Sequence, residues 1–252
     1  MPPATAAATV NSFAALALVD GDDVGDDAAR GEPRASPSTP PLKRPLLWLD
    51  LEMTGLDVGT DVILEIAVAA TDGELARTVD GPALAIEAGE AALAGMNAWC
   101  VEHHGRSGLT AACRSADAVP LAAAEDAVLA FVDAHWPPDK GDKATLAGNS
   151  VHVDLSFLRA HMPRLASRIS HRIVDVTSVG QLALRWAPAA YHSRPAKVGG
   201  GRTSAAGGDS TRHRAAADVR DSIAELRRWK RLLFRPAKDV GRDVAREGKR
   251  GR

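Results

Sequence analysis

Two acidic residues interrupt an otherwise apolar segment near the start of the ordered part of the chain. The stretch LLWLDLEM, residues 46–53, has the composition of a buried strand, yet it contains Asp50 and Glu52. Residues two apart in a strand point to the same face, so the two carboxylates lie side by side, about 7 Å apart along the chain. Neighbouring anions in an apolar setting repel each other and lose hydration. They need a cation, and a divalent metal ion is the strongest available.

Three further residues could complete such a site. Asp154 follows the stretch LAGNSVHV at a strand-to-helix junction, Asp218 lies in the predicted last helix, and His213 lies where that helix begins. Each also has an ordinary explanation. Asp154 could cap a helix or interact with its dipole, and a lone histidine is usually a surface residue. A D-x-E pair by itself is equally well explained by salt-bridged surface carboxylates.

Asp221 follows Asp218 by three residues, on nearly the same helix face. It could therefore belong with the acidic group. It could instead pair with Arg214 or Arg220, and the sequence leaves both alternatives open.

The elements that must position these residues form a mixed pattern. Strands are predicted at 46–53, 62–71, 83–88, 145–148 and 172–176. Helices are predicted over roughly 90–104 and 121–136, from about 154, over 178–187 and from about 213. Turn residues separate the first three strands, as in an antiparallel meander, and helices alternate with strands afterwards. This order predicts an α/β fold with a mixed sheet flanked by helices.

One folded domain is predicted over residues 46–234. The chain has 252 residues, of which 45% are hydrophobic and 25% charged, so it can build a sizeable core. Residues 1–45 are rich in Ala, Pro, Ser and Asp and are predicted to be a disordered low-complexity extension. Residues 192–212 are rich in Gly, Ser and Arg and predict a flexible loop, and 235–252 predict a basic tail.

Composition also limits the class of protein. The formal net charge is -1, so bulk charge gives no argument for a nucleic-acid partner. No apolar run approaches the roughly 20 residues of a membrane helix, and no membrane partner is expected. The two cysteines have no metal-type spacing and suit a reducing compartment. The N-terminus lacks a clear targeting signal, so we expect an intracellular protein, either cytoplasmic or mitochondrial.

Taken together, the four acids and the histidine resemble the DEDDh 3′–5′ exonucleases of the RNase H-like superfamily, and within them the oligoribonuclease family. The segments that carry the resemblance are LLWLDLEMTGLD, MNAWCVEHHGRSGLT, LAGNSVHVDLSFL, RIVDVTSV and HRAAADVRDSIAEL. They occur in the family's order across residues 46–234. The resemblance implies an RNase H-like sheet whose first three strands are antiparallel and whose later strands are parallel.

The resemblance also implies a chemistry. Asp50, Glu52, Asp154 and Asp218 match the acids that hold two Mg²⁺ or Mn²⁺ ions, and His213 matches the general base. Such a site would hydrolyse the 3′-terminal phosphodiester of short oligoribonucleotides and dinucleotides by two-metal-ion catalysis and release nucleoside 5′-monophosphates. A pKa near 6.5 suits an imidazole to proton transfer at cellular pH.

The resemblance further implies several contacts to the RNA substrate. Leu56 matches a residue that wedges between two bases, and Trp99 and His104 match residues near a base. Ser150 and Thr177 match contacts on the phosphate side. Structural alternatives remain open here, namely core packing for Leu56 and Trp99 and helix capping for Ser150.

A homodimer is likewise implied by the resemblance alone. Arg172 matches a basic residue that one subunit donates to the 5′ phosphate bound by its partner. His171 stands where the family commonly has Tyr, and Val153 stands where it usually has Glu or Gln. The loop at 192–212 is longer and richer in Gly than the family's linker.

Two other functions compete with this one. A DEDDh exonuclease could trim or proofread longer RNA or DNA 3′ ends, and a non-catalytic protein could keep the fold and only bind nucleic acid. Aromatic content of 4% and the balanced charge favour short substrates, because proteins that hold long single strands use basic grooves with stacking aromatics. The intact set of acids with His213 argues against the non-catalytic alternative.

Overall fold

The structure is a computed structural model of the chain, and it describes residues 40–193 and 214–234. The chain divides into Met1–Pro40 and Pro41–Arg252, and all the described elements lie in the second unit. The predicted N-terminal extension and basic tail lie outside the described residues, apart from 40–45. The predicted loop at 192–212 also lies outside them, apart from its first two residues, and so does His213.

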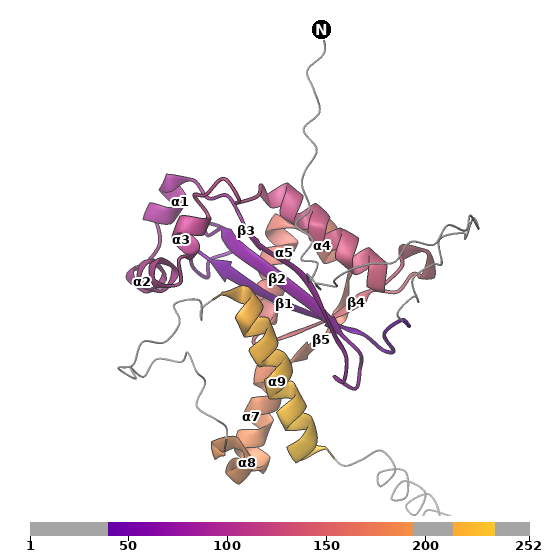
Figure 1. Cartoon of the computed structure of the whole chain (residues 1–252). Coiled ribbons are helices and arrows are strands. Elements are labelled where there is room, and N and C mark those ends of the chain that lie inside the picture. Colours follow the sequence, from indigo (N-terminus) through magenta and orange to yellow (C-terminus); the bar gives the residue numbers. More distant parts are fainter. Residues whose placement is uncertain (1–39, 194–213, 235–252) are drawn as a thin grey trace, which may run out of the picture. The chain divides into compact units, whose positions relative to one another are not determined.

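A mixed sheet of five strands forms the centre of this unit (Figure 1). Its order is β3-β2-β1-β4-β5. The strands are β1 (Leu46–Met53), β2 (Ile63–Thr71), β3 (Thr78–Ala85), β4 (Ala144–Gly148) and β5 (Ile169–Asp175). The pairs β1–β2 and β2–β3 are antiparallel, whereas β1–β4 and β4–β5 are parallel. The predicted α/β fold with three antiparallel strands followed by parallel ones is confirmed.

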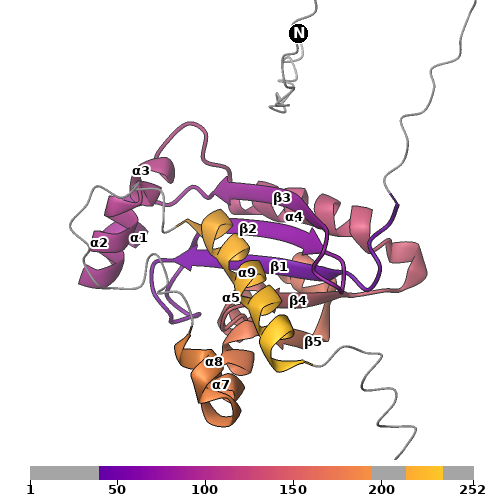
Figure 2. The same cartoon turned by 60° about the horizontal axis from the view of Figure 1, so that its bottom comes forward.

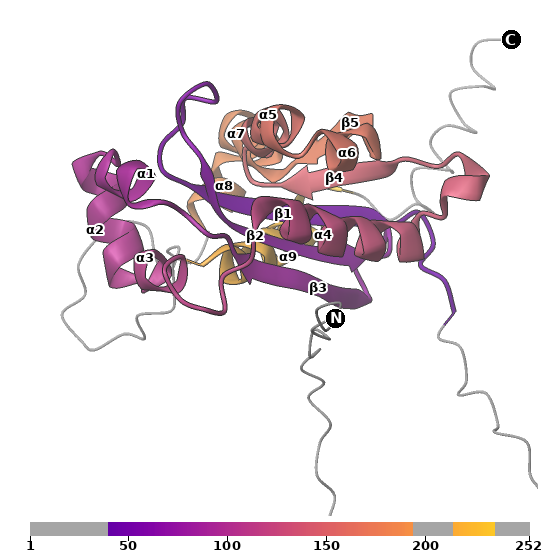
Figure 3. The same ribbon diagram turned by 90° about the horizontal axis from the view of Figure 1, so that it is seen from above.

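Helices cover both faces of the sheet. The helices α4 (Leu121–His135), α5 (His152–His161) and α6 (Pro163–Ser167) pack on one face (Figure 3). On the other face α9 (Ala215–Leu233) crosses β2, β1 and β4, beside α7 (Val176–Trp186) and α8 (Pro188–His192) (Figure 2). Among the described residues, none of the helices has both the length and the apolar character needed to cross a bilayer.

Side chains of β1 alternate between these two layers, as the sequence predicts. Leu47, Leu49 and Leu51 are buried in the core shared with α4 and α5. Trp48 points to the opposite face, into the core shared with α7 and α9. Asp50 and Glu52 have the same parity as Trp48, so they face the N-terminal end of α9.

The predicted elements that differ most from the structure are the third strand and the helix after it. The predicted strand at 83–88 is instead β3, at Thr78–Ala85. Its Gly81 and Pro82 look like a strand boundary in the sequence, but β3 is an edge strand, where proline needs no partner for its missing N–H. The helix predicted at 90–104 is two helices, α1 (Glu90–Ala94) and α2 (Ala98–Arg106). Asn97 breaks it, because its side chain caps α2 by accepting from the Cys100 N–H at 2.9 Å.

Two short elements complete the described part. The helix α3 (Leu109–Ala112) joins α1 and α2 in a small core around Leu64 of β2. A 3₁₀ turn, η1 (Pro138–Lys140), leads into β4. The group α1–α3 thus sits at the end of β1 and β2 where Glu52 lies, and it forms one wall of the candidate site.

Gly148 ends β4 in close contact with β1. A methyl group at this position would lie 2.8 Å from the Leu49 carbonyl oxygen, which is backbone and cannot move aside cheaply. We therefore expect Gly148→Ala to lower the free energy of unfolding by roughly 1–3 kcal/mol, as overpacking does elsewhere. Urea denaturation of the two proteins measures the difference.

Gly105 supplies the matched control for this substitution. It is exposed on α2, and a methyl group there meets nothing within 4 Å. Because alanine favours a helix over glycine, Gly105→Ala should stabilise the protein by up to about 1 kcal/mol. Equal stability of Gly148→Ala and the unmodified chain would contradict the packing described for β4.

Candidate metal-dependent active site

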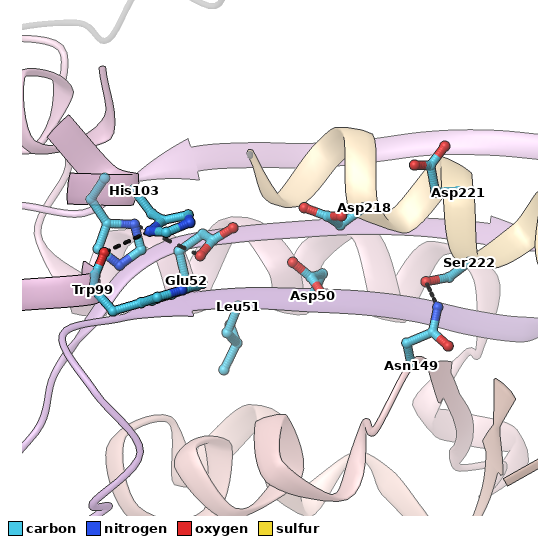
Figure 4. A pocket seen from close by; sticks show the side chains of 10 residues that line it. Asp50, Leu51, Glu52, Trp99, His103, Asn149, Asp218, Asp221 and Ser222 are labelled. Carbon is cyan, nitrogen blue, oxygen red and sulfur yellow. Dashed lines mark hydrogen bonds and ion pairs between the residues drawn. The ribbon is translucent and has the colours of Figure 1, made fainter. Parts of the chain in front are cut away.

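Three carboxylates from two distant segments meet above β1 (Figure 4). Asp50 and Glu52 project from the strand, and Asp218 projects from the first turn of α9. One oxygen atom from each lies within 4.8 Å of the other two. The sequence predicts that these three residues come together, and the structure places them so.

Asp154 lies beside this cluster but is not one of the three. The ladder between β1 and β4 ends at Trp48 and Ala147, so β4 does not reach the Leu51 N–H. The Asp154 carboxylate, in the first turn of α5, accepts that N–H through Oδ1 at 2.9 Å. Asp154 is buried, with 6% of its surface exposed. One of its oxygens therefore secures the backbone between Asp50 and Glu52.

Burial and mutual repulsion raise the pKa of these acids. Burial raises the pKa of Asp50 well above its ordinary value, and the charges of Asp154, Asp218 and Glu52 raise it further. Burial, followed by the charge of Asp218, raises the pKa of Glu52 to about 8. Burial raises the pKa of Asp154 to about 6, although the hydrogen bond from Leu51 opposes the shift. Without a cation the cluster therefore favours protonated carboxyl groups.

The cluster opens into a cavity of about 230 Å³. Strand β1, helices α2 and α9, and the end of β4 contribute its walls. The lining residues are Asp50, Leu51, Glu52, Trp99, His103, His104, Asn149, Asp218, Asp221 and Ser222. A set of hard oxygen donors in a cavity of this kind fits a divalent metal ion.

Helix α2 contributes an aromatic wall. Trp99 is 61% exposed, so the alternative of core packing is wrong. Its ring stacks on His103 with centroids 3.8 Å apart and 18° between the planes. The His103 Nδ1–H donates to the Trp99 carbonyl oxygen at 2.8 Å. The pair presents a flat aromatic surface next to the carboxylates.

His104, the other predicted residue of this helix, is buried. Its Nε2 lies 2.9 Å from the Met53 carbonyl oxygen, and its Nδ1 lies 3.9 Å from a Glu52 oxygen. His104 thus joins α2 to the end of β1 as well as lining the cavity.

A chain of polar side chains leads away from the cavity below α9. The Ser150 hydroxyl donates to the Thr177 hydroxyl at 3.1 Å, which donates to the Asn149 side-chain oxygen at 3.2 Å. The Asn149 amide donates to the Ser222 hydroxyl at 2.8 Å. Ser150 does not cap α5 through its side chain; its backbone is left-handed (φ 52°) and its N–H donates to Asp175. Ser150 and Thr177 are therefore linked to the cavity through Asn149.

Leu56 lies on the turn between β1 and β2 with 76% of its surface exposed, so core packing does not explain it. Asp61 holds this turn in shape. Its carboxylate accepts from the Thr54 hydroxyl at 2.8 Å and from the Asp57 N–H at 2.9 Å. The leucine is thus an exposed apolar side chain on a braced turn.

His171 and Arg172 are exposed on β5, the edge strand opposite β3, and neither lines the cavity. The predicted contribution of Arg172 across a dimer stays a prediction. Val153, in the first turn of α5, packs against the core.

Sequence reasoning left Asp221 with two alternatives and did not single out His103, Asn149 or Ser222. The structure decides between the two alternatives for Asp221. Arg214 pairs with Glu65 and Arg220 with Asp80, whereas Asp221 lines the cavity. Asn149 lies in the same segment as Asp154, LAGNSVHVDLSFL, and directly follows a buried strand. This position could have identified it as a candidate site residue.

The sequence matches an exonuclease family, and the fold matches known exonuclease structures. The model of the exonuclease family matches residues 47–226. The structure of Escherichia coli exonuclease I in complex with a dT13 oligonucleotide aligns with 76% of this chain and 41% of its own, at a TM-score of 0.54 and 16% identity. A second exonuclease I structure aligns with 75% of this chain and 41% of its own, at a TM-score of 0.55. The protein is a nuclease with an RNase H-like exonuclease fold.

Curated relatives narrow the class. An oligoribonuclease of Arabidopsis thaliana is 39% identical over 89% of this chain and 96% of its own. An oligoribonuclease of Colwellia psychrerythraea is 42% identical over 75% of this chain and 96% of its own. A mitochondrial oligoribonuclease of Mus musculus is 40% identical over 77% of this chain and 75% of its own. The chain belongs to the oligoribonuclease family.

The raised pKa values predict how stability depends on pH. A carboxyl group whose pKa is higher in the folded than in the unfolded state stabilises the fold at low pH, and this stability is lost as pH rises through the folded value. The pKa of Glu52 is about 8 and that of Asp154 about 6 in the fold. Without divalent metal, the contribution of these acids to the melting temperature should therefore fall between about pH 5 and 8.5.

Adding Mn²⁺ should reverse this trend, because metal binding needs deprotonated ligands and strengthens as pH rises. Glu52→Gln should flatten the metal-free slope and reduce the Mn²⁺ effect. The control is Glu87→Gln, at an exposed position. Thermal denaturation across pH, with chelator or with Mn²⁺, measures both effects. If the metal-free melting temperature changes equally with pH in Glu52→Gln and Glu87→Gln, the raised pKa is wrongly assigned to Glu52.

Proposed function

We propose that the protein is a 3′-to-5′ exoribonuclease that hydrolyses short oligoribonucleotides and dinucleotides to nucleoside 5′-monophosphates. The observation that carries the proposal is the meeting of Asp50, Glu52 and Asp218 in an open cavity. The family adds support, because curated relatives that match three quarters or more of the chain are named oligoribonucleases.

Divalent metal ions would be held by Asp50, Glu52 and Asp218, with Asp154 as a fourth ligand through its second oxygen. We expect two ions, Mg²⁺ or Mn²⁺, because hard oxygen donors suit them. When bound, such ions activate a water molecule and stabilise the leaving oxygen of an in-line displacement. We assign His213 as the general base from the family resemblance; it directly precedes Arg214 in the sequence but lies outside the described residues.

The substrate's bases and phosphates would contact different walls of the site. The exposed Trp99 ring, backed by His103, offers a surface on which a base can stack. We assign Leu56 the role of a wedge between two bases. His104 lines the cavity beside Glu52 and is assigned to the base side of the site. Ser150 and Thr177 would act on the phosphate side, by way of the Asn149 hydrogen bonds.

The protein is proposed to work as an intracellular homodimer. Arg172, with His171 beside it, would reach the 5′ phosphate of RNA bound to the partner subunit. Support comes from the exposure of both residues on an edge strand and from two exposed apolar side chains on the following helix, Leu182 (41%) and Trp186 (76%). The mouse relative is named mitochondrial, so a mitochondrial or a cytoplasmic location is proposed.

The proposed activity predicts a preference for very short RNA. Initial rates with 5′-labelled RNAs from a dinucleotide to about twenty nucleotides should be highest for the dinucleotide, and chelator should abolish them. Asp218→Asn removes one carboxylate of the cluster and should slow hydrolysis by roughly a hundredfold or more, since even outer-shell changes weaken metal sites ten- to a hundredfold. Asp117→Asn, at an exposed position, serves as the control.

The alternative functions give other results in the same assay. Processive degradation of the longest RNA or of DNA would instead indicate an exonuclease that trims or proofreads long ends. Binding without cleavage in Mn²⁺ would indicate a non-catalytic protein and would contradict the proposed activity.

Leu56→Ala tests the proposed wedge. Losing one apolar contact to a base should raise KM for the dinucleotide about tenfold, because burying a leucine side chain contributes about 1.5–3 kcal/mol. Mn²⁺ affinity should not change, because Leu56 is not part of the carboxylate cluster. Leu232→Ala, which also removes an exposed leucine, is the control. Steady-state kinetics and Mn²⁺ titration measure the two effects, and an unchanged KM would remove Leu56 from the substrate site.

A further inference from the structure

A buried carboxylate next to the cluster has no role in the proposed chemistry. Glu65 of β2 has 2% of its surface exposed. Its Oε1 accepts from the Arg214 Nε at 2.7 Å, with the Arg214 Nη2 also 2.7 Å away. Its Oε2 accepts from the Ala215 N–H at 3.0 Å. Glu65 therefore binds both the side chain and the backbone at the point where α9 begins.

This carboxylate stands in an electrostatically unfavourable place. Glu65 pairs directly with Glu52 in the β1–β2 register, so both side chains lie on the same face of the sheet. The charge of Glu65 contributes to raising the pKa of Asp50 and Glu52, whereas the charge of Arg214 lowers the pKa of Glu52. An amide could accept the Ala215 N–H without the repulsion, so the feature that requires a carboxylate here is the pair with Arg214.

The start of α9 depends on this contact. Arg214 is the N-cap residue, with extended backbone, and no side chain of its own segment caps the helix. The Glu65 carboxylate of β2 instead accepts the Ala215 N–H at the N-terminus of α9, the helix end that favours negative charge. Farther along, Val219, Ile223 and Trp229 bury α9 against the sheet, but apolar contacts are non-directional. Directional contacts also hold α9 farther along, at Ser222, which accepts from the Asn149 amide, and at Arg227, which donates to the Leu75 carbonyl oxygen. A directional contact at the first turn itself is Glu65 with Arg214 and Ala215.

We propose that Glu65 and Arg214 are positioning residues that set the first turn of α9 so that Asp218 meets Asp50 and Glu52. Asp218 follows Ala215 by three residues, less than one helical turn, so a displacement of the Ala215 backbone moves Asp218 with it. The inference rests on the proposed metal-dependent function and assigns the pair an effect on metal affinity, beyond an effect on stability.

A second pair of the same design provides a matched control. Glu125 of α4 is buried, with 5% exposed. It accepts from the Arg164 Nε at 2.9 Å and from the Leu165 N–H at 3.0 Å, so one glutamate again binds an arginine and the next backbone N–H. This pair holds α6 on the opposite face of the sheet and does not line the cavity.

The test compares Glu65→Gln with Glu125→Gln in the full chain. Mn²⁺ binding is measured by calorimetry at about pH 8, and thermal stability is measured with chelator. We expect both variants to lose stability, but only Glu65→Gln to bind Mn²⁺ roughly ten- to a hundredfold more weakly, as outer-shell substitutions do. Its dinucleotide hydrolysis should rise toward the unmodified rate as Mn²⁺ is increased, because the defect lies in metal affinity.

The possible results separate this inference from the proposed function. The positioning role would be overturned if Glu65→Gln bound Mn²⁺ as tightly as the unmodified chain does, or if Glu125→Gln weakened Mn²⁺ binding equally. Neither result would contradict the metal site itself. If the unmodified chain binds no Mn²⁺, the proposed function fails and the inference fails with it. Arg214→Gln is the second variant in case Glu65→Gln does not fold, because this side chain is 30% exposed. It should weaken Mn²⁺ binding in the same way, and wild-type affinity would overturn the inference.

Discussion

Repulsion among carboxylates on one face of β1 is the constraint on which the site depends. Strand alternation places Asp50 and Glu52 on the same face, and α9 adds Asp218 within 4.8 Å. A fold that only maximised its stability would avoid such a group, because each buried charge loses hydration and repels the others. The surrounding core, with Trp48 fully buried beneath α9, offsets this cost. The cluster can therefore be accommodated within a stable fold.

The site combines rigid and exposed parts in a way that suits its proposed work. The acids lie on a central strand and on first turns of helices, where backbone hydrogen bonds hold them. The proposed base contacts, Leu56 and Trp99, are large apolar side chains left exposed at the margin. Each is supported by a local contact: Asp61 braces the turn of Leu56, and His103 backs the ring of Trp99. Cleavage at the end of a short RNA needs acids in fixed positions to hold metal ions and exposed apolar surfaces to contact the bases, and the proposed site combines the two.

The sequence predicts local features of this protein better than long-range ones. The faces of β1 follow from alternation within eight residues, and so do the shared positions of Asp50 and Glu52. The strand over β3 is misplaced because Gly81 and Pro82 give a turn signal that edge strands tolerate. Asp218 is 166 residues from Glu52 in the sequence, and only the family resemblance predicts that the two meet. Glu65 reads as an ordinary interruption of an apolar strand, because its partner Arg214 is 149 residues away and neither residue shows the pairing by itself.

Local surroundings explain why the pKa values of Asp154 and Glu52 differ. Asp154 lies in the first turn of α5, where the positive end of the dipole favours its charge, and it also accepts the Leu51 N–H. Glu52 lies on β1, where burial is followed by the neighbouring charges of Asp218, Glu65 and Asp154, which raise its pKa further. In agreement, burial raises the pKa of Asp154 only to about 6, but the pKa of Glu52 reaches about 8. Glu52 therefore gains more from a bound cation than Asp154 does, because its charged form is the less favourable of the two without metal.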